Sequence, residues 1–370
     1  MSIVTNPIKS DLRKFLLSAL ALTFIGLVFI YSSSSIFAME KFGSASYFLK
    51  KQFFYLILSI GCFFVFTATP IKFWKKNAPL FFFGAICLTL LTFVPFLGLK
   101  CHGSNRWLRI GGFGFQPSEL LKLFLLIYLG FFLEKKQLVS GSFINSYLPF
   151  LSILGVTSLV LLKQPDFGSV ITLFSTAIIL LFIAEFNLFY LGMTVLAMIP
   201  AVVYLVLAKS YRLNRILIFL NPWSDPQGKG FQIIQSLIAV GSGSFWGLGL
   251  SNSKQKFFYL PMQHTDFIFS ILAEETGFIG CALVILLYFG LCYWGFKLAL
   301  KFQDPFAFFT TLGFVIFISL QAVINLMVTT GLLPTKGLGL PFISYGGTAL
   351  LSLFCMLGLI SNFARNAEQA

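Results

Sequence analysis

The chain has few of the side chains that build metal centres or nucleotide sites. Its 370 residues include only two histidines, His102 and His264, and no HExxH pattern, so a histidine-based metal centre is disfavoured. None of the six cysteines has CxxC spacing and all but Cys101 lie in apolar runs, so we expect free thiols. The Walker lysine motif is also absent, which disfavours ATP-driven transport.

Apolar residues are abundant instead. Hydrophobic residues make up 58% of the chain and charged residues 10%, with a mean hydropathy of +0.90. No water-soluble fold tolerates this balance, so we predict an all-α polytopic membrane protein. The net charge of +14 predicts attraction to anionic membrane lipids. Because membrane location explains that charge, nucleic acid binding has no support.

Apolar runs of spanning length predict about ten transmembrane helices in one membrane domain covering residues 1–370. They fall near 15–36, 52–69, 78–97, 118–133, 144–162, 168–185, 188–208, 267–295, 306–327 and 347–363. The first run follows basic residues like a signal peptide, but Ile36-Phe37-Ala38 is a poor cleavage site, so we expect an uncleaved span. The distribution of basic residues leaves the orientation ambiguous.

Two polar loops interrupt the apolar pattern, near 98–117 and 209–266. The larger loop lies directly before the eighth predicted helix and is basic. Within it, residues 231–240 are apolar but contain glutamines, which predicts an interfacial or re-entrant helix. The glycines between Gly241 and Gly249 fit no nucleotide fingerprint and favour close backbone approach.

Asp266 stands at the edge of the long apolar helix expected from residue 267. An ionisable group at a membrane boundary is costly, which makes it a functional candidate. It could simply cap the helix, where a carboxylate is favoured by the helix dipole. Partial desolvation opposes that ionisation, and a carboxylate held between the two influences could act as a base.

Other charged residues lie near membrane edges. Glu119 and Lys122 have i, i+3 spacing after Pro117 and can pair, although a capped helix with a snorkelling lysine explains them equally. Arg106 and Arg109 suit phosphate binding, or contact with lipid headgroups. The adjacent acids at 274 and 275 cannot share a helix face, so at least one should pair with a polar group of another span.

The stretch from Gly331 to Gly347 cannot form a regular helix because glycines and prolines interrupt it repeatedly. Irregular backbone at membrane depth is tolerated only against protein or a water-filled cavity. We therefore expect this segment to line a cavity.

Two long motifs carry a family resemblance. Leu260–Phe269 resembles the LPExHTDFIF signature of the SEDS proteins (shape, elongation, division and sporulation), and Leu333–Gly347 resembles their LPTKGLPLPFISYGG signature. Shorter matches occur in order at 106–108, 116–120 and 221–228. Residues 255–261 and 335–338 look more like the division member than the elongation member. Met262 and Gly339 depart from the family pattern, where Glu and Pro are usual.

The resemblance implies ten spans in the bacterial cytoplasmic (inner) membrane, with both termini cytoplasmic and the large loop extracytoplasmic. It also implies a peptidoglycan glycosyltransferase of the division septum that polymerises lipid II, an undecaprenyl-diphosphate-linked disaccharide. The family's essential aspartate matches Asp266, and its acid and lysine at the fourth span match Glu119 and Lys122. The implied partners are a class B penicillin-binding protein transpeptidase and other division proteins.

The chemistry of this reaction suits the residues present. Asp266 would remove a proton from the acceptor sugar, and nearby cations could stabilise the diphosphate. We expect substrate-binding roles for Arg106, Arg109, Glu119, Lys122, Arg212, Arg215, Lys256, His264, Thr265, Lys336 and Ser344. No cofactor is certain, but a divalent cation, Mg²⁺ or Mn²⁺, could share the task. Two other functions stay open: a lipid II flippase, and a non-catalytic scaffold of the division machinery.

Overall fold

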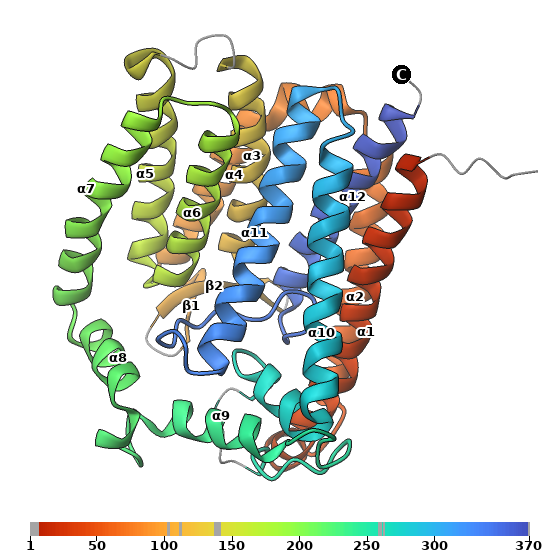
Figure 1. Ribbon diagram of the computed structural model, residues 1–370, viewed down its shortest axis with the longest axis vertical. Coiled ribbons are helices and arrows are strands. Elements are labelled where there is room, and N and C mark those ends of the chain that lie inside the picture. Colours follow the sequence, from red (N-terminus) through yellow and green to blue (C-terminus); the bar gives the residue numbers. More distant parts are fainter. Residues whose placement is uncertain are drawn as a thin grey trace, which may run out of the picture.

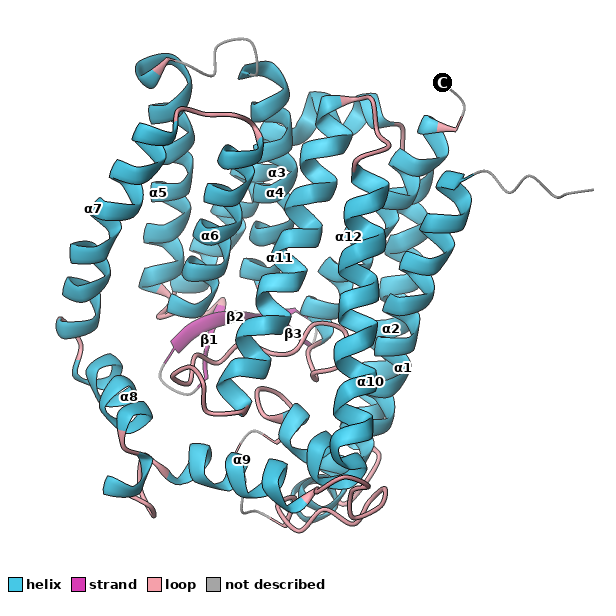
Figure 2. Cartoon of the chain, viewed as in Figure 1, coloured by secondary structure: helices cyan, strands magenta, loops and turns pink. Residues whose placement is uncertain are grey.

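Long helices standing side by side make up most of the molecule (Figure 1). The computed structural model describes residues 7–101, 104–110, 113–136, 142–257, 261 and 263–368. The first and last described segments lie at the same end of the bundle, where Lys9 and Glu368 form an ion pair with an N–O distance of 3.3 Å. Short helices, loops and a small sheet gather toward the opposite end (Figure 2).

Each predicted apolar run lies mainly on a helix. These helices are α1 (Pro7–Phe42), α2 (Tyr47–Ala68), α3 (Ile71–Leu90), α4 (Pro117–Lys136), α5 (Leu148–Lys163), α6 (Phe167–Ile183), α7 (Leu188–Leu207), α10 (Ile268–Ala299), α11 (Pro305–Thr329) and α12 (Gly347–Ala367). Within the described residues, eight helices are long and apolar enough to span a membrane. The other two differ because α6 has 17 residues and α4 carries several charges. The all-α polytopic fold is confirmed, and the count of ten stays a prediction.

The helix α3 begins at Ile71, before its predicted apolar run at 78–97, because its first two turns carry charged residues. Lys75 lies in its second turn and donates hydrogen bonds to Glu134 of α4 and to Asp304 before α11, each at 2.7 Å. A lysine stem can lie along apolar surface while its ammonium reaches polar partners. This ion-paired group ties three helices together at the end of the bundle that holds the termini.

The polar loops contain structure that the sequence did not predict. The smaller loop contains an antiparallel sheet of β1 (Gly98–Cys101), β2 (Ser104–Ile110) and β3 (Phe113–Phe115), in that order. In the larger loop, α9 (Phe231–Ser242) confirms the predicted helix, whereas α8 (Ser210–Leu220) was not expected. The sheet was missed because three- to seven-residue strands among glycines give little periodic signal.

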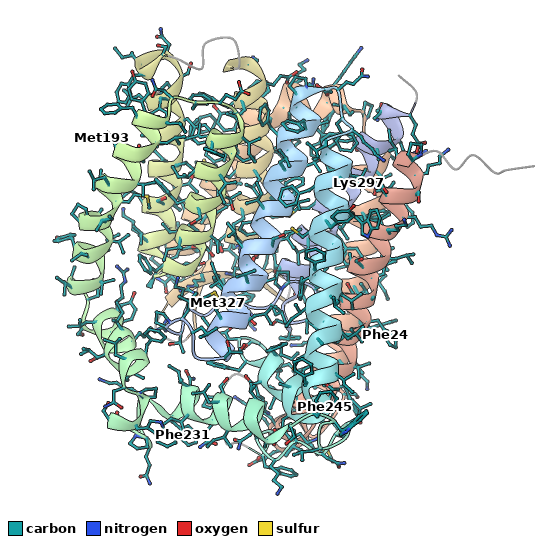
Figure 3. The ribbon with its side chains drawn as sticks, viewed as in Figure 1. Phe24, Met193, Phe231, Phe245, Lys297 and Met327 are labelled. Carbon is teal, nitrogen blue, oxygen red and sulfur yellow. The ribbon has the colours of Figure 1, made fainter. Side chains whose placement is uncertain are left out.

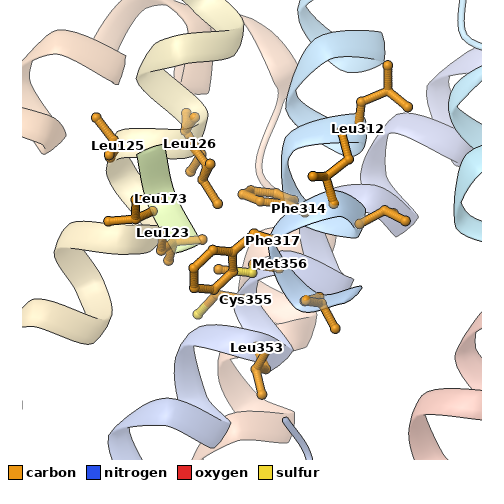
Figure 4. Packing of buried hydrophobic residues seen from close by; sticks show 14 of the residues in the cluster. Leu123, Leu125, Leu126, Leu173, Leu312, Phe314, Phe317, Leu353, Cys355 and Met356 are labelled. Atoms are coloured by element: carbon orange, nitrogen blue, oxygen red, sulfur yellow. The ribbon is translucent and has the colours of Figure 1, made fainter. Parts of the chain in front are cut away.

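Most of the long helices contribute to one hydrophobic core, and α4, α6, α11 and α12 meet in the part of it drawn in close-up. Their side chains interdigitate in Figure 4, which labels Leu123, Leu126, Leu173, Phe314, Phe317, Cys355 and Met356 among others. Small residues permit close approach, as at Gly130, where an added Cβ would lie 2.1 Å from Thr310 Oγ1. Helices in a membrane associate through such packing rather than through hydrophobic burial. By contrast, Phe24 of α1 and Met193 of α7 are exposed and point outward (Figure 3).

The long helix α10 breaks at Gly277, whose φ of 63° and ψ of −160° are not helical. The carbonyls of Glu274 and Glu275 accept hydrogen bonds from the N–H groups of Leu248 and Gly249, both at 3.0 Å. A Cβ added to Gly277 would lie 2.4 Å from the nitrogen of Gly247. The close backbone approach predicted for residues 241–249 is therefore confirmed, and its partner is the break in α10.

We predict that Gly277→Ala lowers the thermal unfolding temperature in detergent or nanodiscs. A side chain at this φ and contact distance forces the backbone to shift, at a cost of about 1–3 kcal/mol. Gly84→Ala in α3 is the matched control, because an added Cβ there meets nothing within 4 Å. The control should be neutral or slightly stabilising; an equal loss in both variants would contradict the prediction.

Candidate functional site

The loop that carries Asp266 is held by its main chain. Three consecutive carbonyls accept hydrogen bonds from later parts of the chain. The His264 carbonyl accepts from the Tyr345 N–H at 3.0 Å, that of Thr265 from Ser344 Oγ at 2.6 Å, and that of Asp266 from Asn325 Nδ2 at 2.9 Å. These bonds join the two signature motifs, 260–269 and 333–347, into one structural unit.

Two cavities meet at the Asp266 side chain. The first, called the α9 cavity, has a volume of 560 Å³, and the second, the α4–α6 cavity, has 640 Å³. Both are lined by Tyr211, Arg215, Asp266 and residues 335–338. The α9 cavity adds Asn214, Lys229, Phe231 and Gln232, and the α4–α6 cavity adds Arg106, Glu119, Lys122, Asp166 and Arg212, among others. One carboxylate therefore faces two adjoining spaces.

The surroundings of Asp266 act on the pKa of its carboxyl group in both directions. Burial raises the pKa to about 6, while the positive charges of Arg215 and Arg106 lower it and the negative charge of Asp166 raises it. Desolvation disfavours a carboxylate, and nearby cations favour it. A carboxyl group with a pKa near 6 is mostly ionised at neutral pH and can accept a proton.

Two predicted guanidinium groups lie at the α4–α6 cavity and donate hydrogen bonds to backbone carbonyls. Arg106 donates to the carbonyls of Gln164 and Pro165, both at 2.7 Å. Arg215 donates to the carbonyl of Thr335 at 3.1 Å and lines both cavities. Neither forms an ion pair within the described residues. Their charge is therefore free to act on an anion in the cavity.

The other two predicted arginines differ from this pair. Arg212 lines the α4–α6 cavity but is buried, donating to the Leu205 carbonyl at 2.7 Å and lying 5.3 Å from the Phe167 ring. Arg109 is exposed and does not line either cavity. Arg106 and Arg109 are three residues apart on β2, and side chains at odd spacing on a strand point to opposite faces. Of these two arginines, Arg106 therefore lines the cavity and Arg109 does not.

Glu119 and Lys122 form the predicted pair, with an N–O distance of 2.6 Å, and both line the α4–α6 cavity. Only 3% of the Lys122 side chain is exposed, so it does not snorkel to a membrane surface. Its ammonium also lies 5.8 Å from the centre of the Phe317 ring. A buried, paired lysine contributes a locally balanced charge to the cavity wall rather than a free one.

The remaining residues predicted from the signature motifs have different surroundings. Lys336 lines both cavities, and burial lowers the pKa of its ammonium. Thr265 and Ser344 line the α4–α6 cavity. His264 is outside both cavities and packs against the rings of Phe37, Phe48 and Tyr345. Burial lowers its pKa to about 4, so it is neutral.

Lys256 lies away from the other predicted residues, in a buried polar group. Its ammonium is 3.5 Å from Glu275 of α10 and it lines neither cavity. Glu275 also accepts from Ser32 Oγ of α1 at 2.6 Å, while Glu274 accepts from the Lys254 N–H at 2.9 Å. The expectation that at least one of the two acids pairs with a polar group of another span is confirmed. These contacts anchor residues 253–256 to the bundle.

Several polar residues at the cavities were missed from the sequence, among them Asp166, Gln321 and Asn325. Asp166 lines the α4–α6 cavity and caps α6, accepting from Ser169 Oγ at 2.8 Å. Gln321 and Asn325, one turn apart on α11, line the α4–α6 and α9 cavities respectively. Asp166 had a signal, because an acid after Pro165 and before an apolar run predicts a cap. For Gln321 and Asn325 the sequence offered no signal except that each is a polar residue within an apolar run.

The two departures from the family pattern have separate outcomes. Met262 lies outside the described residues. Gly339 lines the α4–α6 cavity, and its carbonyl accepts from Gln321 Nε2 at 2.8 Å. A Cβ added there would lie 3.0 Å from the Cβ of Ser344. The backbone at Gly339 is thus held by α11 even without the usual proline, and the predicted cavity lining by residues 331–347 is confirmed.

Together, the fold and the site define a polytopic helical membrane protein with a basic, acid-containing pair of cavities at one end of its bundle. The family model for FtsW, RodA and SpoVE, described as cell cycle proteins, matches residues 13–369. The chain belongs to this family, and the SEDS resemblance is confirmed.

Curated relatives match nearly the whole chain. A probable peptidoglycan glycosyltransferase FtsW of Geobacter sp. (strain M18) is 44% identical over 356 residues, covering 96% of this chain and 97% of the relative. The stage V sporulation protein E of Bacillus subtilis (strain 168) is 39% identical over 363 residues, covering 98% of both chains.

Solved structures share the fold. A chain from a peptidoglycan synthase complex that coordinates polymerization and crosslinking has a TM-score of 0.79 and 28% identity, covering 96% of this chain and 98% of its own. Thermus thermophilus RodA, a rod shape determining protein, has a TM-score of 0.71 and 24% identity over 96% of this chain and 97% of its own. The latter likeness concerns the fold alone.

We predict that Lys256→Met lowers the unfolding temperature strongly and Arg215→Met only weakly. Removing one partner of a buried ion pair leaves an uncompensated charge, which costs about 3–5 kcal/mol. Arg215 is exposed to the cavities and has no acidic partner within hydrogen-bonding distance in the described chain. Thermal unfolding of the two variants side by side checks this. Equal losses would show that Lys256 is not held as the structure indicates.

Proposed function

We propose that this protein is a peptidoglycan glycosyltransferase that polymerises lipid II into glycan strands, with Asp266 as the general base. The observation that carries the proposal is one half-buried carboxyl group shared by two adjoining cavities, beside cations without acidic partners. A polymerase must hold a donor and an acceptor at one reacting centre, and two cavities meeting at one base suit that need. The curated FtsW relatives support the same activity.

The proposed step joins two sugars by inversion. The Asp266 carboxylate takes the proton of the acceptor hydroxyl as its oxygen bonds to the anomeric carbon of the donor. The bond from that carbon to the diphosphate oxygen breaks, and lipid diphosphate leaves with the electron pair. This reaction needs one base and no covalent enzyme intermediate, in keeping with a single carboxyl group shared by both cavities.

Cations at the cavities would stabilise the leaving diphosphate. Arg106, Arg215 and Lys336 line the α4–α6 cavity without acidic partners among the described residues, and Arg212 lies beside them. Groups fixed before the reaction stabilise developing charge without having to reorganise. Glu119 and Lys122 neutralise each other, so we assign them to shaping and polarising the wall rather than to holding net negative charge.

A divalent cation, Mg²⁺ or Mn²⁺, fits this site only as a companion of the substrate. Within the described residues, no group of three or more potential ligands occurs. Mg²⁺ in phosphate sites needs only one or two carboxylates besides the phosphates. Asp166, which lines the α4–α6 cavity, would hold it, and it would neutralise charge on the diphosphate.

The proposal places the cavities on the outer face of the bacterial cytoplasmic membrane at the division septum, with both termini cytoplasmic. Pairing of Lys9 with Glu368 supports placing both termini on one side. A penicillin-binding protein transpeptidase is the proposed partner, supported by the resemblance to a chain of a peptidoglycan synthase complex. A flippase would need the cavities but not a base, and a scaffold would need neither.

We predict that Asp266→Asn abolishes glycan polymerisation when the protein is assembled with its cognate transpeptidase and given purified lipid II. The amide keeps the shape but cannot accept the proton, so the rate should fall about 10²–10⁴-fold. Glycan length on gels measures the product. Glu185→Gln, an exposed acid in the turn between α6 and α7, is the control and should retain full activity.

The outcomes separate the three functions. Polymer from Asp266→Asn at the wild-type rate would remove Asp266 from the chemistry. Absence of polymer from an assembled wild-type pair, together with lipid II movement across vesicles, would favour the flippase. Absence of both would favour the scaffold.

We also predict that polymerisation depends on pH with an acid limb near pH 6. The base works as a carboxylate, and its pKa is raised to about 6, so activity should rise with pH through that value and then level off. Because the charge of Arg215 lowers this pKa, Arg215→Met should move the limb to higher pH. Profiles of kcat/KM between about pH 4 and 8 check both shifts. A limb that Arg215→Met moves downward would contradict the assignment.

A further inference from the structure

Asn325 lies near the C-terminal end of α11 with only 1% of its surface exposed. Its amide nitrogen donates to two main-chain carbonyls, that of Asp266 at 2.9 Å and that of Leu338 at 2.6 Å. Only the NH₂ end of an amide can serve two acceptors, so the neighbours determine the orientation of this side chain. Its Oδ1 atom is buried and has no hydrogen-bond partner within the described chain.

The two carbonyls belong to segments that cannot satisfy them locally. Asp266 lies just before the first turn of α10, and Leu338 lies in the irregular stretch between α11 and α12. A buried carbonyl without a partner costs about 1–3 kcal/mol. Gln321, one turn away on α11, supplies a similar bond to Gly339, whereas among the described residues it is Asn325 whose side chain donates to the Asp266 carbonyl. Asn325 therefore bridges the two segments that together form the wall shared by the cavities.

The bridge determines what faces the carboxyl group. Gly337 immediately precedes Leu338, and a Cβ added to it would lie 3.5 Å from Oδ2 of Asp266. Holding Leu338 thus keeps the main chain at 337 beside the carboxyl group, where it contributes to the burial of that group. The φ of Gly337, +67°, is a left-handed conformation that glycine adopts readily, so the segment needs little strain to take this path.

We infer that Asn325 is a positioning residue for the reaction: by joining the main chain of Asp266 to that of Leu338, it holds the carboxyl group at the junction of the two cavities. This inference rests on the proposed role of Asp266 as base. The Asn325 amide nitrogen is engaged with the two main-chain carbonyls, so it acts on Asp266 through the backbone. Effects of about 10²-fold can follow from displacing a reacting group by about 1 Å.

Loosening the bridge should also change the proton affinity of Asp266. Four charged groups face or surround this carboxyl group: Arg215 from α8, Arg106 from β2, Asp166 before α6, and Lys336 on the shared wall. Asn325→Leu leaves all four in place and removes the two hydrogen bonds. Entry of water would relieve the desolvation that opposes ionisation, so the pKa should fall toward its ordinary value.

The test compares Asn325→Leu and Asn325→Ala with wild type, each assembled with the transpeptidase in nanodiscs. We expect kcat to fall about 10–100-fold with KM for lipid II nearly unchanged, and the acid limb to move to lower pH. Asn325→Ala removes the same two hydrogen bonds without adding charge or bulk. It covers the case in which the leucine variant fails to fold.

Asn362→Leu is the matched control. Asn362 is equally buried on α12 and donates to three carbonyls, those of Phe66, Thr67 and Thr69, in the turn that follows α2. It should lose thermal stability to a similar degree while kcat and the acid limb stay unchanged. If the Asn325 variants lose stability like the control but keep kcat and the acid limb, the inference is overturned.

A second readout needs no activity. ¹³C NMR of aspartate-labelled protein, with the Asp266 signal assigned by its loss in Asp266→Asn, gives the pKa of that carboxyl group directly. A pKa that falls in Asn325→Leu and not in Asn362→Leu supports the positioning role; an unchanged pKa overturns it. A wild-type protein that makes no polymer would refute the proposed function, and this titration would still decide what Asn325 does to Asp266.

Discussion

Backbone groups outside helices are the central constraint on this molecule. A membrane-embedded bundle offers no water to unpaired carbonyls, so irregular segments survive only where protein groups satisfy them. The loop of residues 264–266 and the stretch of residues 331–346 meet this requirement largely by serving each other. Tyr345, Ser344 and Asn325 donate to three successive carbonyls before α10. The same bonds that make the irregular backbone tolerable also hold Asp266 in place.

The break in α10 follows the same rule at a second place. The carbonyls that lose their helical partners at Gly277 are paired with the N–H groups of residues 248 and 249. Nearby, the carboxylates of Glu274 and Glu275 hold residues 253–256 through backbone N–H groups and Lys256. The large polar loop is therefore attached to α10 both through the carbonyls and through the carboxylates of Glu274 and Glu275.

The cationic side chains fall into two groups, those paired with acidic residues and those that remain able to bind an anionic ligand. Lys256, Lys122 and Lys75 are paired with acids, whereas Arg106 and Arg215 donate to carbonyls and form no ion pair in the part of the chain that the structure describes. A carbonyl orients a guanidinium group without neutralising it, so its field remains available to an anionic ligand. The ion pairs thus distinguish cations that stabilise the fold from cations that remain able to bind a diphosphate.

The amino-acid sequence by itself determined the membrane class, the positions of the apolar helices and the prominence of Asp266. These rest on composition, on run length and on the cost of an acid at a membrane edge, all of which are local properties. Both signature motifs could also be recognised along the chain, as could the helix at 231–242 and the pairing of Glu119 with Lys122, because i, i+3 spacing is a short-range geometry.

Only the tertiary structure decided which cations share a space with Asp266. Lys256 is ten residues from it in sequence and belongs to a separate buried group, whereas Arg106 and Asp166 come from distant segments and act on its pKa. The roles of Asn325 and Gln321 were equally hidden, since a lone amide in an apolar run carries no sign of its acceptor. The sequence gives the chemical type of each side chain. Its burial, its partners and its proton affinity depend on which segments come into contact, and long-range packing determines those contacts.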